Sequence, residues 1–287
     1  MTAREWLRKY TSIFQQACIG EEAEEALALL CHALRLNKAA LLSQPERMLT
    51  SGELMLLEGI TERRLRREPT AYIAGQKEFY GLNFFVDPRV LIPRPETETL
   101  VEAAIEFHRS WALRNRRRML AADIGTGCGA IAIALAANIA EAQLYAVDIS
   151  PAALEVAAIN VHRHELDKRV ALIQGNLLEP IIQKIDLIVA NLPYVPHGDL
   201  PGLQPEIYMY EPTNALDGGE SGIDFIQALL EQSPGKLAAG GALFLEIGEE
   251  QEQVLMPLAA RLLPGAEIGL VKDMAGINRC MKISMPC

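Results

Sequence analysis

The sequence predicts an α/β fold built on a mainly parallel sheet, with helices on both faces of the sheet and a separate helical segment before it. Three observations predict this. The chain has 287 residues, which is enough for about two domains. Apolar side chains recur at helical spacing through residues 2–75. From Met119 onward, strand-like and helix-like segments alternate, as they do in parallel sheets.

The first 75 residues predict a small helical domain. Helical spacing of apolar residues marks segments 2–17, 21–36 and 51–67. Pro69 disfavours helix at the residue before it, so the helical region is expected to end there. Aromatic and β-branched residues then flank Gly81, which predicts a β-hairpin within residues 77–87. The hairpin would link the helical domain to the rest of the chain.

The remaining residues predict a seven-stranded sheet. The expected strands are 119–124, 143–148, 170–174, 184–190, 242–247, 266–272 and 280–285. The expected helices are 97–107, 130–139, 152–162, 222–237 and 251–263. The link between the last two strands is too short for a parallel crossover, so this pair should be antiparallel.

Composition excludes several classes of protein. Asp and Glu number 37 against 27 Lys and Arg, a net charge of −10, which argues against a broad basic surface that coats phosphates. No apolar run approaches the length of a membrane span, and the N-terminus lacks the apolar core of a secretory signal. The five scattered cysteines predict reduced thiols in the cytoplasm. The one close histidine pair, His162 and His164, has no further ligands nearby, so no metal site is expected.

A glycine-rich loop, Asp-Ile-Gly-Thr-Gly-Cys-Gly at residues 123–129, follows a predicted strand and opens a helix. Its glycines permit a tight turn and close approach of a ligand to the backbone. Asp148 ends the next strand, where a carboxylate can accept hydrogen bonds from ribose hydroxyls. The Gly-x-Gly-x-Gly spacing, Asp123 and Asp148 together favour S-adenosylmethionine. NAD and a glycine turn without a ligand stay open as alternatives.

A second motif, Asn191-Leu-Pro-Tyr194, directly follows the predicted strand 184–190. Ligands of open α/β sheets bind beyond the carboxyl ends of the strands, so this motif and the glycine loop should line one site. The Asn191 amide oxygen and the Leu192 backbone carbonyl offer two acceptors for an NH₂ group. Tyr194 offers a flat face for a planar amide or base. An ordinary loop is the alternative interpretation.

The chain resembles the protein-(glutamine-N5) methyltransferases of the HemK/PrmC type, which modify peptide chain release factors. The resemblance spans nearly the whole chain. Besides the two motifs above it includes segments 68–79, 91–98, 211–216 and 245–248. Segment 91–98, Leu-Ile-Pro-Arg-Pro-Glu-Thr-Glu, is the most specific, because generic methyltransferases lack it.

This resemblance implies a seven-stranded, Rossmann-like methyltransferase domain at residues 96–287. A helical substrate-recognition domain at 1–75 and a β-hairpin linker at 76–95 would precede it. It implies methyl transfer from S-adenosyl-L-methionine to the side-chain amide nitrogen of the glutamine in the Gly-Gly-Gln motif of a release factor. The catalytic residues implied are Asn191, Leu192, Pro193 and Tyr194. The cofactor site implied comprises Asp123, Gly125, Thr126, Gly127, Cys128, Gly129, Asp148, Asn176, Leu177 and Asn191. We expect a cytoplasmic monomer with a protein partner and no direct contact with nucleic acid or membrane.

Three positions depart from the family pattern. Leu192 stands where the first proline of Asn-Pro-Pro-Tyr is usual. Any residue supplies the backbone carbonyl, so we expect a less preorganised loop that keeps its chemistry. Asn176 replaces a frequent aspartate, yet its amide oxygen can still accept a hydrogen bond from an adenine amino group. Cys128 replaces a serine or threonine, and we expect no catalytic thiol because methyl transfer from a sulfonium needs no covalent intermediate.

Alternative functions remain at this stage. Asn-Leu-Pro-Tyr is also the form of this loop in ribosomal RNA adenine dimethyltransferases, so an rRNA adenine N6-methyltransferase is one rival. A ribosomal protein glutamine methyltransferase and a pseudo-enzyme inactivated by Leu192 are two more. An RNA enzyme should carry a basic surface. The local basic runs are the arginines at 63, 64, 66 and 67 and those at 114 and 116–118. We expect mainly solvated faces there, with contact to an acidic partner as the alternative.

Overall fold

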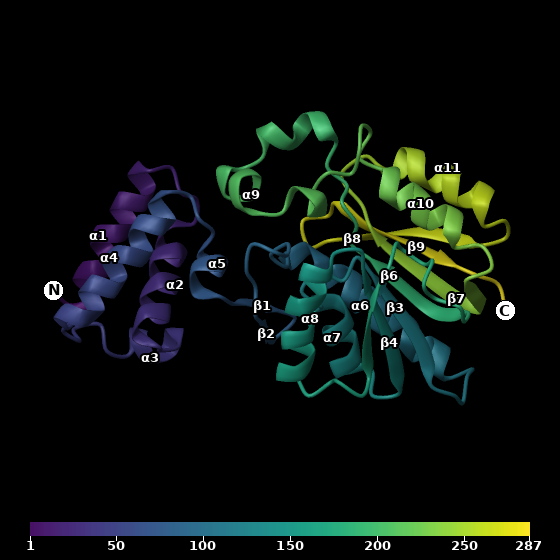
Figure 1. Cartoon of the computed structure of the whole chain (residues 1–287), viewed down its shortest axis with the longest axis horizontal. Helices are drawn as coiled ribbons and strands as arrows, with labels where there is room; N and C mark the ends of the chain where they lie inside the picture. The colour runs from purple at the N-terminus through teal and green to yellow at the C-terminus, as the bar shows by residue number, and fades with distance from the viewer. The chain divides into compact units, whose positions relative to one another are not determined.

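The computed structural model describes all residues, 1–287, and divides into two compact units (Figure 1). The N-terminal unit comprises Met1–Gln76 together with Gln204–Tyr210. The C-terminal unit comprises Lys77–Leu203 and Glu211–Cys287. No helix in the chain is both long enough and apolar enough to cross a membrane.

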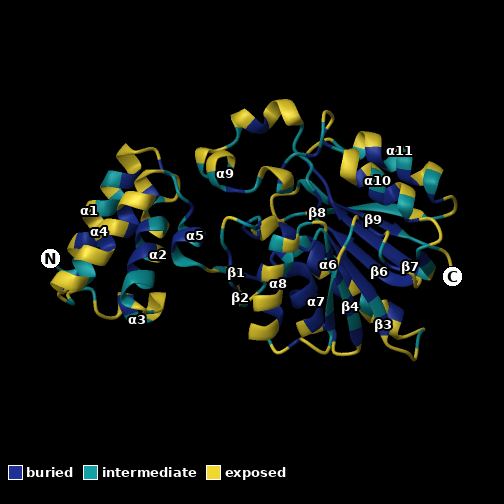
Figure 2. Cartoon of the chain, in the orientation of Figure 1, coloured by how far each residue is buried: buried dark blue, intermediate teal, exposed yellow.

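The N-terminal unit is a helical bundle. Its helices are α1 (Ala3–Gln16), α2 (Glu22–Leu34), α3 (Lys38–Leu42), α4 (Ser51–Leu65), α5 (Thr70–Ala74) and α9 (Pro205–Tyr210). The three predicted helical segments are confirmed as α1, α2 and α4. Thr2 and Thr50 close capping boxes at the starts of α1 and α4, which satisfies backbone donors at both helix starts. The apolar faces meet in a core that includes Trp6, Phe14 and Leu57, and Figure 2 shows this buried interior.

Helix α9 joins this bundle although it lies far along the chain, between two strands of the sheet. Arg64 in α4 binds the Glu25 carboxylate through Nε at 2.6 Å and the Glu206 carboxylate through Nη2 at 2.9 Å. The Tyr210 hydroxyl donates to the Arg66 carbonyl at 2.7 Å. The Arg64 side chain is only 4% exposed. The expectation of a solvated arginine face is therefore wrong for Arg64, because a buried ion-pair network recruits it.

A seven-stranded sheet forms the centre of the C-terminal unit. Its strands are β3 (Met119–Ile124), β4 (Ala142–Asp148), β5 (Val170–Gln174), β6 (Ile185–Ala190), β7 (Leu237–Glu246), β8 (Glu267–Lys272) and β9 (Asn278–Ser284). Their order is β5-β4-β3-β6-β7-β9-β8. The first five are parallel, and β9 runs antiparallel to both β7 and β8. The predicted α/β class and the antiparallel final pair are confirmed. The chain changes direction across the sheet between β3 and β6, where open α/β sheets bind their ligands.

Helices cover both faces of the sheet. In Figure 1, α6 (Glu98–Ala112), α7 (Ala130–Asn138) and α8 (Pro151–Arg163) lie on one face, and α10 (Asp224–Gln232) and α11 (Glu252–Leu262) lie on the other. The predicted helix 222–237 is wrong at its end. It stops at Gln232 because Ser-Pro-Gly follows, with Gly235 at φ +83°. Strand β7 consequently starts at Leu237, five residues earlier than the predicted start at 242.

The predicted hairpin is confirmed as β1 (Lys77–Phe79) and β2 (Leu82–Phe84), which pair antiparallel. Its two-residue tip has Tyr80 at φ +50° and Gly81 at φ +72°. Positive φ at both positions is the conformation that matches the twist of tight hairpins. The side chains of Phe79 and Phe84 are fully buried, so these two aromatic residues anchor the hairpin.

Candidate active site

The glycine loop and the Asn191–Tyr194 motif begin at the ends of two neighbouring strands. The first follows β3 and the second follows β6, and these strands pair in parallel with Ile124 opposite Ala190. The Leu192 side chain is buried against the glycine loop, and a β-carbon on Gly125 would lie 2.9 Å from Leu192 Cδ2. The structure therefore brings the two motifs together at the carboxyl edge of the sheet.

The glycine loop folds over the end of β4. Gly125, Gly127 and Gly129 all have φ between +55° and +86°, where other residues are strained. The Gly125 and Thr126 amides donate to the Val147 carbonyl at 2.9 and 3.0 Å. The Gly127 amide donates to Asp148 Oδ2 at 2.8 Å. The loop conformation is thus fixed by the next strand and by Asp148.

Two side chains of the glycine loop, those of Asp123 and Cys128, are buried. Asp123 is fully buried and accepts hydrogen bonds at Oδ2 from the Thr126 hydroxyl at 2.6 Å and the Ala132 amide at 3.0 Å. Burial raises the pKa of Asp123 to about 7. Burial likewise raises the pKa of the Cys128 thiol to about 12. A thiol with that pKa stays protonated at neutral pH, so Cys128 is no nucleophile.

Asp148 and the predicted adenine-side residues lie on adjoining strand ends. Asp148 Oδ1 accepts from the Ser150 amide at 2.9 Å, and burial raises the pKa of its carboxyl group. The Gly175 amide, just beyond β5, donates to the Asp148 carbonyl at 3.0 Å. Asn176 donates through Nδ2 to Glu179 Oε1 at 2.7 Å, which leaves its amide oxygen as an acceptor. Leu177 is buried at φ +51°.

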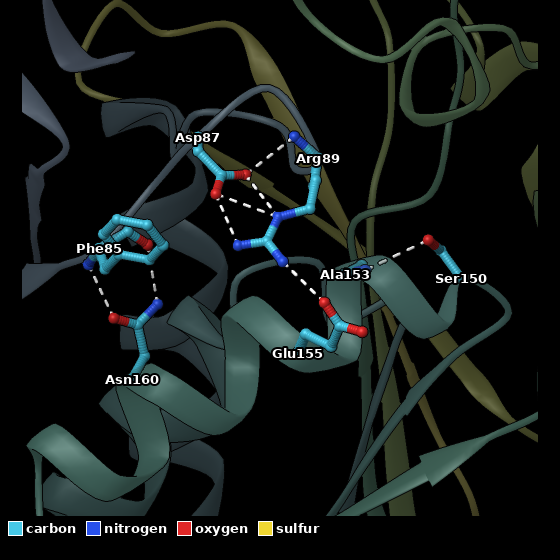
Figure 3. Close-up of polar contacts among 7 residues, drawn as sticks. All are labelled: Phe85, Asp87, Arg89, Ser150, Ala153, Glu155 and Asn160. Atoms are coloured by element: carbon cyan, nitrogen blue, oxygen red, sulfur yellow. Dashed lines mark hydrogen bonds and ion pairs between the residues drawn. The ribbon is translucent and has the colours of Figure 1, made fainter. Parts of the chain in front are cut away.

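The segment after the hairpin is fixed to α8 and to the glycine loop. Asn160 in α8 accepts from the Phe85 amide at 2.7 Å and donates to the Phe85 carbonyl at 2.9 Å (Figure 3). It also donates to the Cys128 carbonyl at 2.8 Å. Arg89 binds Asp87 at 2.6 Å and Glu155 of α8 at 2.8 Å (Figure 3). This segment then continues into residues 91–98.

Residues 91–98 reach the Asn191 motif. The Asn191 amide donates through Nδ2 to the Thr97 hydroxyl at 3.1 Å. The Tyr194 hydroxyl donates to Glu246 at the end of β7, at 3.3 Å. Burial raises the pKa of Glu246, and hydrogen bonds from Thr97 and Tyr194 lower it. Arg94 pairs with the buried Glu211 at 2.5 Å, so segments 91–98 and 211–216 also meet.

Gln251 and two glycines support this motif from behind, and none of them was expected as a site residue. Gln251 Nε2 donates to the Tyr194 and Gly222 carbonyls at 3.0 Å each. A β-carbon on Gly218 would lie 2.8 Å from the Pro193 carbonyl, and one on Gly222 would lie 2.6 Å from the Tyr194 carbonyl. The glycines permit this close backbone approach. The cluster Gly218-Gly-x-x-Gly222 was the available signal in the sequence.

The site presents a narrow set of chemical groups. It holds acceptors for N–H groups at Asn191 and at the Leu192 carbonyl, a carboxylate at Asp148, and an aromatic ring at Tyr194. The structure contains no cluster of three or more His, Cys, Asp or Glu side chains suited to a metal ion. Together with the strand order and the glycine loop after β3, this arrangement defines a methyltransferase with a Rossmann-like sheet.

Comparisons with known proteins narrow this class. Residues 5–75 match the family model of the PrmC N-terminal domain, and residues 111–201 match that of the methyltransferase small domain. The release factor glutamine methyltransferase of Geobacter sulfurreducens is 42% identical over 234 residues, which cover 81% of this chain and 79% of the relative. The Bacillus cereus protein of the same name is 35% identical over 99% of this chain and 100% of its own length. The chain belongs to the release factor glutamine methyltransferase family.

A solved structure agrees on the fold. The ribosomal protein L11 methylase of Lactobacillus delbrueckii subsp. bulgaricus superposes with a TM-score of 0.51 at 23% identity. The match covers 70% of this chain and 84% of that protein. At this identity the likeness concerns the methyltransferase fold alone.

Proposed function

We propose that this chain transfers a methyl group from S-adenosyl-L-methionine to the side-chain amide nitrogen of a glutamine in the Gly-Gly-Gln motif of a peptide chain release factor. The observation that carries the proposal is the Asn191 amide, held by Thr97 next to the glycine loop. The names of the relatives at 35–42% identity support the choice of substrate.

The cofactor fits the residues beyond β3, β4 and β5. The glycine loop offers close backbone approach, and the buried Asp123 Oδ1 atom has no hydrogen-bond partner within the chain. Asp148 would accept the ribose hydroxyls, since its two carboxylate oxygens can together accept about four hydrogen bonds and backbone amides do not occupy them all. Asn176 Oδ1 would accept the adenine amino group, with Leu177 beside it. The cofactor supplies a methyl group on a positively charged sulfur.

The chain's own groups would activate the substrate by orientation. An amide nitrogen is a poor nucleophile because its lone pair is delocalised into the carbonyl. Asn191 Oδ1 and the Leu192 carbonyl would accept its two N–H bonds and hold the nitrogen at about 3–3.5 Å from the methyl carbon. The same acceptors favour the positive charge that develops on the nitrogen. The Tyr194 ring would pack against the planar amide.

Surface charge supports a protein substrate over RNA. Arg63 pairs with Glu68, Arg64 with Glu25 and Glu206, Arg66 with Glu62, and Arg67 with Glu206. In the second run, Arg117 holds the buried Asp186 at 2.6 Å through two nitrogens. These arginines are engaged within the chain, and the net charge is −10. We therefore propose a release factor as partner, without direct binding of nucleic acid, for a monomer that works in the cytoplasm.

Competition between substrates tests this function. Methyl-labelled S-adenosylmethionine is supplied with equal amounts of a release factor, ribosomal RNA and ribosomal proteins, and the label in each is counted. We expect label in the release factor alone. Label in RNA or in a ribosomal protein would overturn the proposal. Activity that appears only in the Leu192→Pro variant would show that the parent chain is a pseudo-enzyme.

A further inference from the structure

A hydrogen-bonded chain of side chains runs behind the Asn191 amide. Asn191 Nδ2 donates to the Thr97 hydroxyl at 3.1 Å, and the Thr97 side chain hydrogen-bonds the Glu246 carboxyl. The Tyr194 hydroxyl donates to the same carboxyl at 3.3 Å. Thr97 is 4% exposed and Glu246 is 3% exposed, so neither is a surface contact. The three elements involved are the start of α6, the loop after β6 and the end of β7.

The number of protons available shows which group donates in each hydrogen bond of this network. A carboxylate only accepts hydrogen bonds, and a hydroxyl has one proton to donate. The Thr97 oxygen accepts from Asn191 Nδ2 at 3.1 Å, so the one hydroxyl proton of Thr97 remains for the buried Glu246 carboxyl group. The Thr97 oxygen can then only accept, so the side of Asn191 that faces it must be the NH₂ group. If the Asn191 amide were flipped, its Oδ1 atom would face the Thr97 oxygen. Both atoms are acceptors, so this hydrogen bond would be lost.

We propose that Thr97, anchored by the buried Glu246, is the positioning residue that fixes the amide of Asn191 with Oδ1 turned toward the substrate glutamine. This rests on the proposed function, because it specifies how the proposed acceptor is aimed. Asn191 Oδ1 accepts no hydrogen bond within the chain, so it is available to the substrate N–H. Segment 91–98 would therefore position the Asn191 amide through Thr97, in addition to leading into α6.

Glu246 anchors the network from the opposite side. Its Oε2 atom is buried and has no hydrogen-bond partner, so the carboxyl group makes only the bonds to Thr97 and Tyr194. One buried carboxyl thus holds both the residue that aims Asn191 and the aromatic ring three positions after it.

Thr97→Val tests the proposal, because it replaces the hydroxyl by a methyl group of similar volume. We expect kcat for release-factor methylation to fall about 10-fold or more, since small misplacements at a reacting centre have effects of this size. The Kd for S-adenosylmethionine, measured by calorimetry, should stay within about twofold because the glycine loop, Asp148 and Asn176 are unchanged. If kcat is unchanged while the parent is active, the positioning role is refuted and the function stands. An inactive parent would instead refute the function.

A matched pair of variants protects the test from a folding defect. Thr97→Ala and Thr97→Ser both remove the methyl group and differ only in the hydroxyl. We expect Thr97→Ser to keep most of the parent kcat and Thr97→Ala to behave as Thr97→Val does. Equal activities of the Ser and Ala variants would contradict the proposal.

A double-mutant cycle shows whether Thr97 acts through Asn191. If it does, adding Thr97→Val to Asn191→Ala should lower kcat no further, because the group to be positioned is already gone. A merely structural role would make the two losses multiply. Multiplying losses would therefore overturn the proposal.

Discussion

The side chain of Leu192 packs directly on the backbone of Gly125, so that a β-carbon at Gly125 would stand 2.9 Å from Leu192 Cδ2. This contact joins the motif of the proposed substrate acceptor to the loop proposed to hold the cofactor. It also explains how leucine serves where the family usually has proline. The loop gains packing against the glycine loop in place of the fixed φ of a proline ring.

Gly125→Ala should destabilise the unliganded protein by about 2–3 kcal/mol, from overpacking against Leu192 together with the strain of φ +75°. Gly127→Ala is the matched control. It has φ +55° with no atom within 4 Å of the added carbon, so its cost should be only the strain of about 1 kcal/mol. Urea unfolding without cofactor measures both. Adding Leu192→Ala to Gly125→Ala should recover the difference, and equal losses in the two glycine variants would show that the contact is unimportant.

Arg64→Met should destabilise the N-terminal unit by about 3 kcal/mol, because Glu25 and Glu206 lose the buried cation between them. Arg66→Gln serves as control, since its pair with Glu62 is exposed at 3.4 Å and is worth at most about 1 kcal/mol. Trp6 lies in the core of this unit, so its fluorescence in a Trp111→Phe background reports on the unit alone. Hydrogen exchange should also rise at residues 204–210 in Arg64→Met. Equal effects of the two variants would contradict a structural role for the buried network.

Stability of the unliganded protein should fall as pH rises from about 4 to about 8, in part through Asp123. Burial raises the pKa of its carboxyl group from the ordinary 3.8 to about 7. The folded state therefore binds the proton more tightly than the unfolded state, and the contribution is complete below pH 3.8 and lost through pH 7.

Asp123→Asn isolates this contribution because asparagine cannot ionise. The difference in unfolding free energy between parent and variant, measured by urea titration at pH 5 and pH 8, should shift in favour of the variant at pH 8. Glu211 and Glu246 also have pKa values raised by burial, but they are present in both proteins and cancel in the difference. A difference that does not change with pH would refute the assignment.

Asn191→Ala should lower methylation of a release factor about 100-fold or more, a loss of the size seen when one preorganised hydrogen-bonding group is removed from an active site. Binding of S-adenosylmethionine should remain within about threefold, since Asp148, Asn176 and the glycine loop are intact. Calorimetry and initial rates measure the two effects separately. An Asn191→Ala variant that methylates at the parent rate would remove Asn191 from the mechanism.

Much of the fold was predictable because it depends on local patterns. Apolar periodicity located α1, α2, α4 and all seven strands of the large sheet, and the short link after β8 predicted its antiparallel partner. The end of α10 was missed although Ser233-Pro-Gly235 marks it in the sequence, because the predicted helix was extended to the next apolar residue, Leu237. Helix α9 was missed because six residues are too few for a periodic signal.

Only those parts of the site that follow from neighbouring parallel strands could be predicted. Parallel strand ends predicted that the glycine loop and the Asn191 motif would line one site, but no sequence spacing relates Thr97 to Asn191 or Glu246 to Tyr194. The first contact joins segment 91–98 to the loop after β6, and the second follows from the pairing of β6 with β7. Arg64 was misassigned for a similar reason, because its partner Glu206 lies 142 residues away.

The central claim is that this chain methylates a release-factor glutamine. The direct measurement is tandem mass spectrometry of peptides from a release factor incubated with the enzyme and S-adenosylmethionine. The account predicts a peptide one methyl group heavier, with the added mass on the glutamine side chain of the Gly-Gly-Gln motif. It also predicts that this peptide is absent when Asn191→Ala replaces the parent over the same time. An unmodified glutamine with the active parent, or a methyl group on another residue, would contradict it.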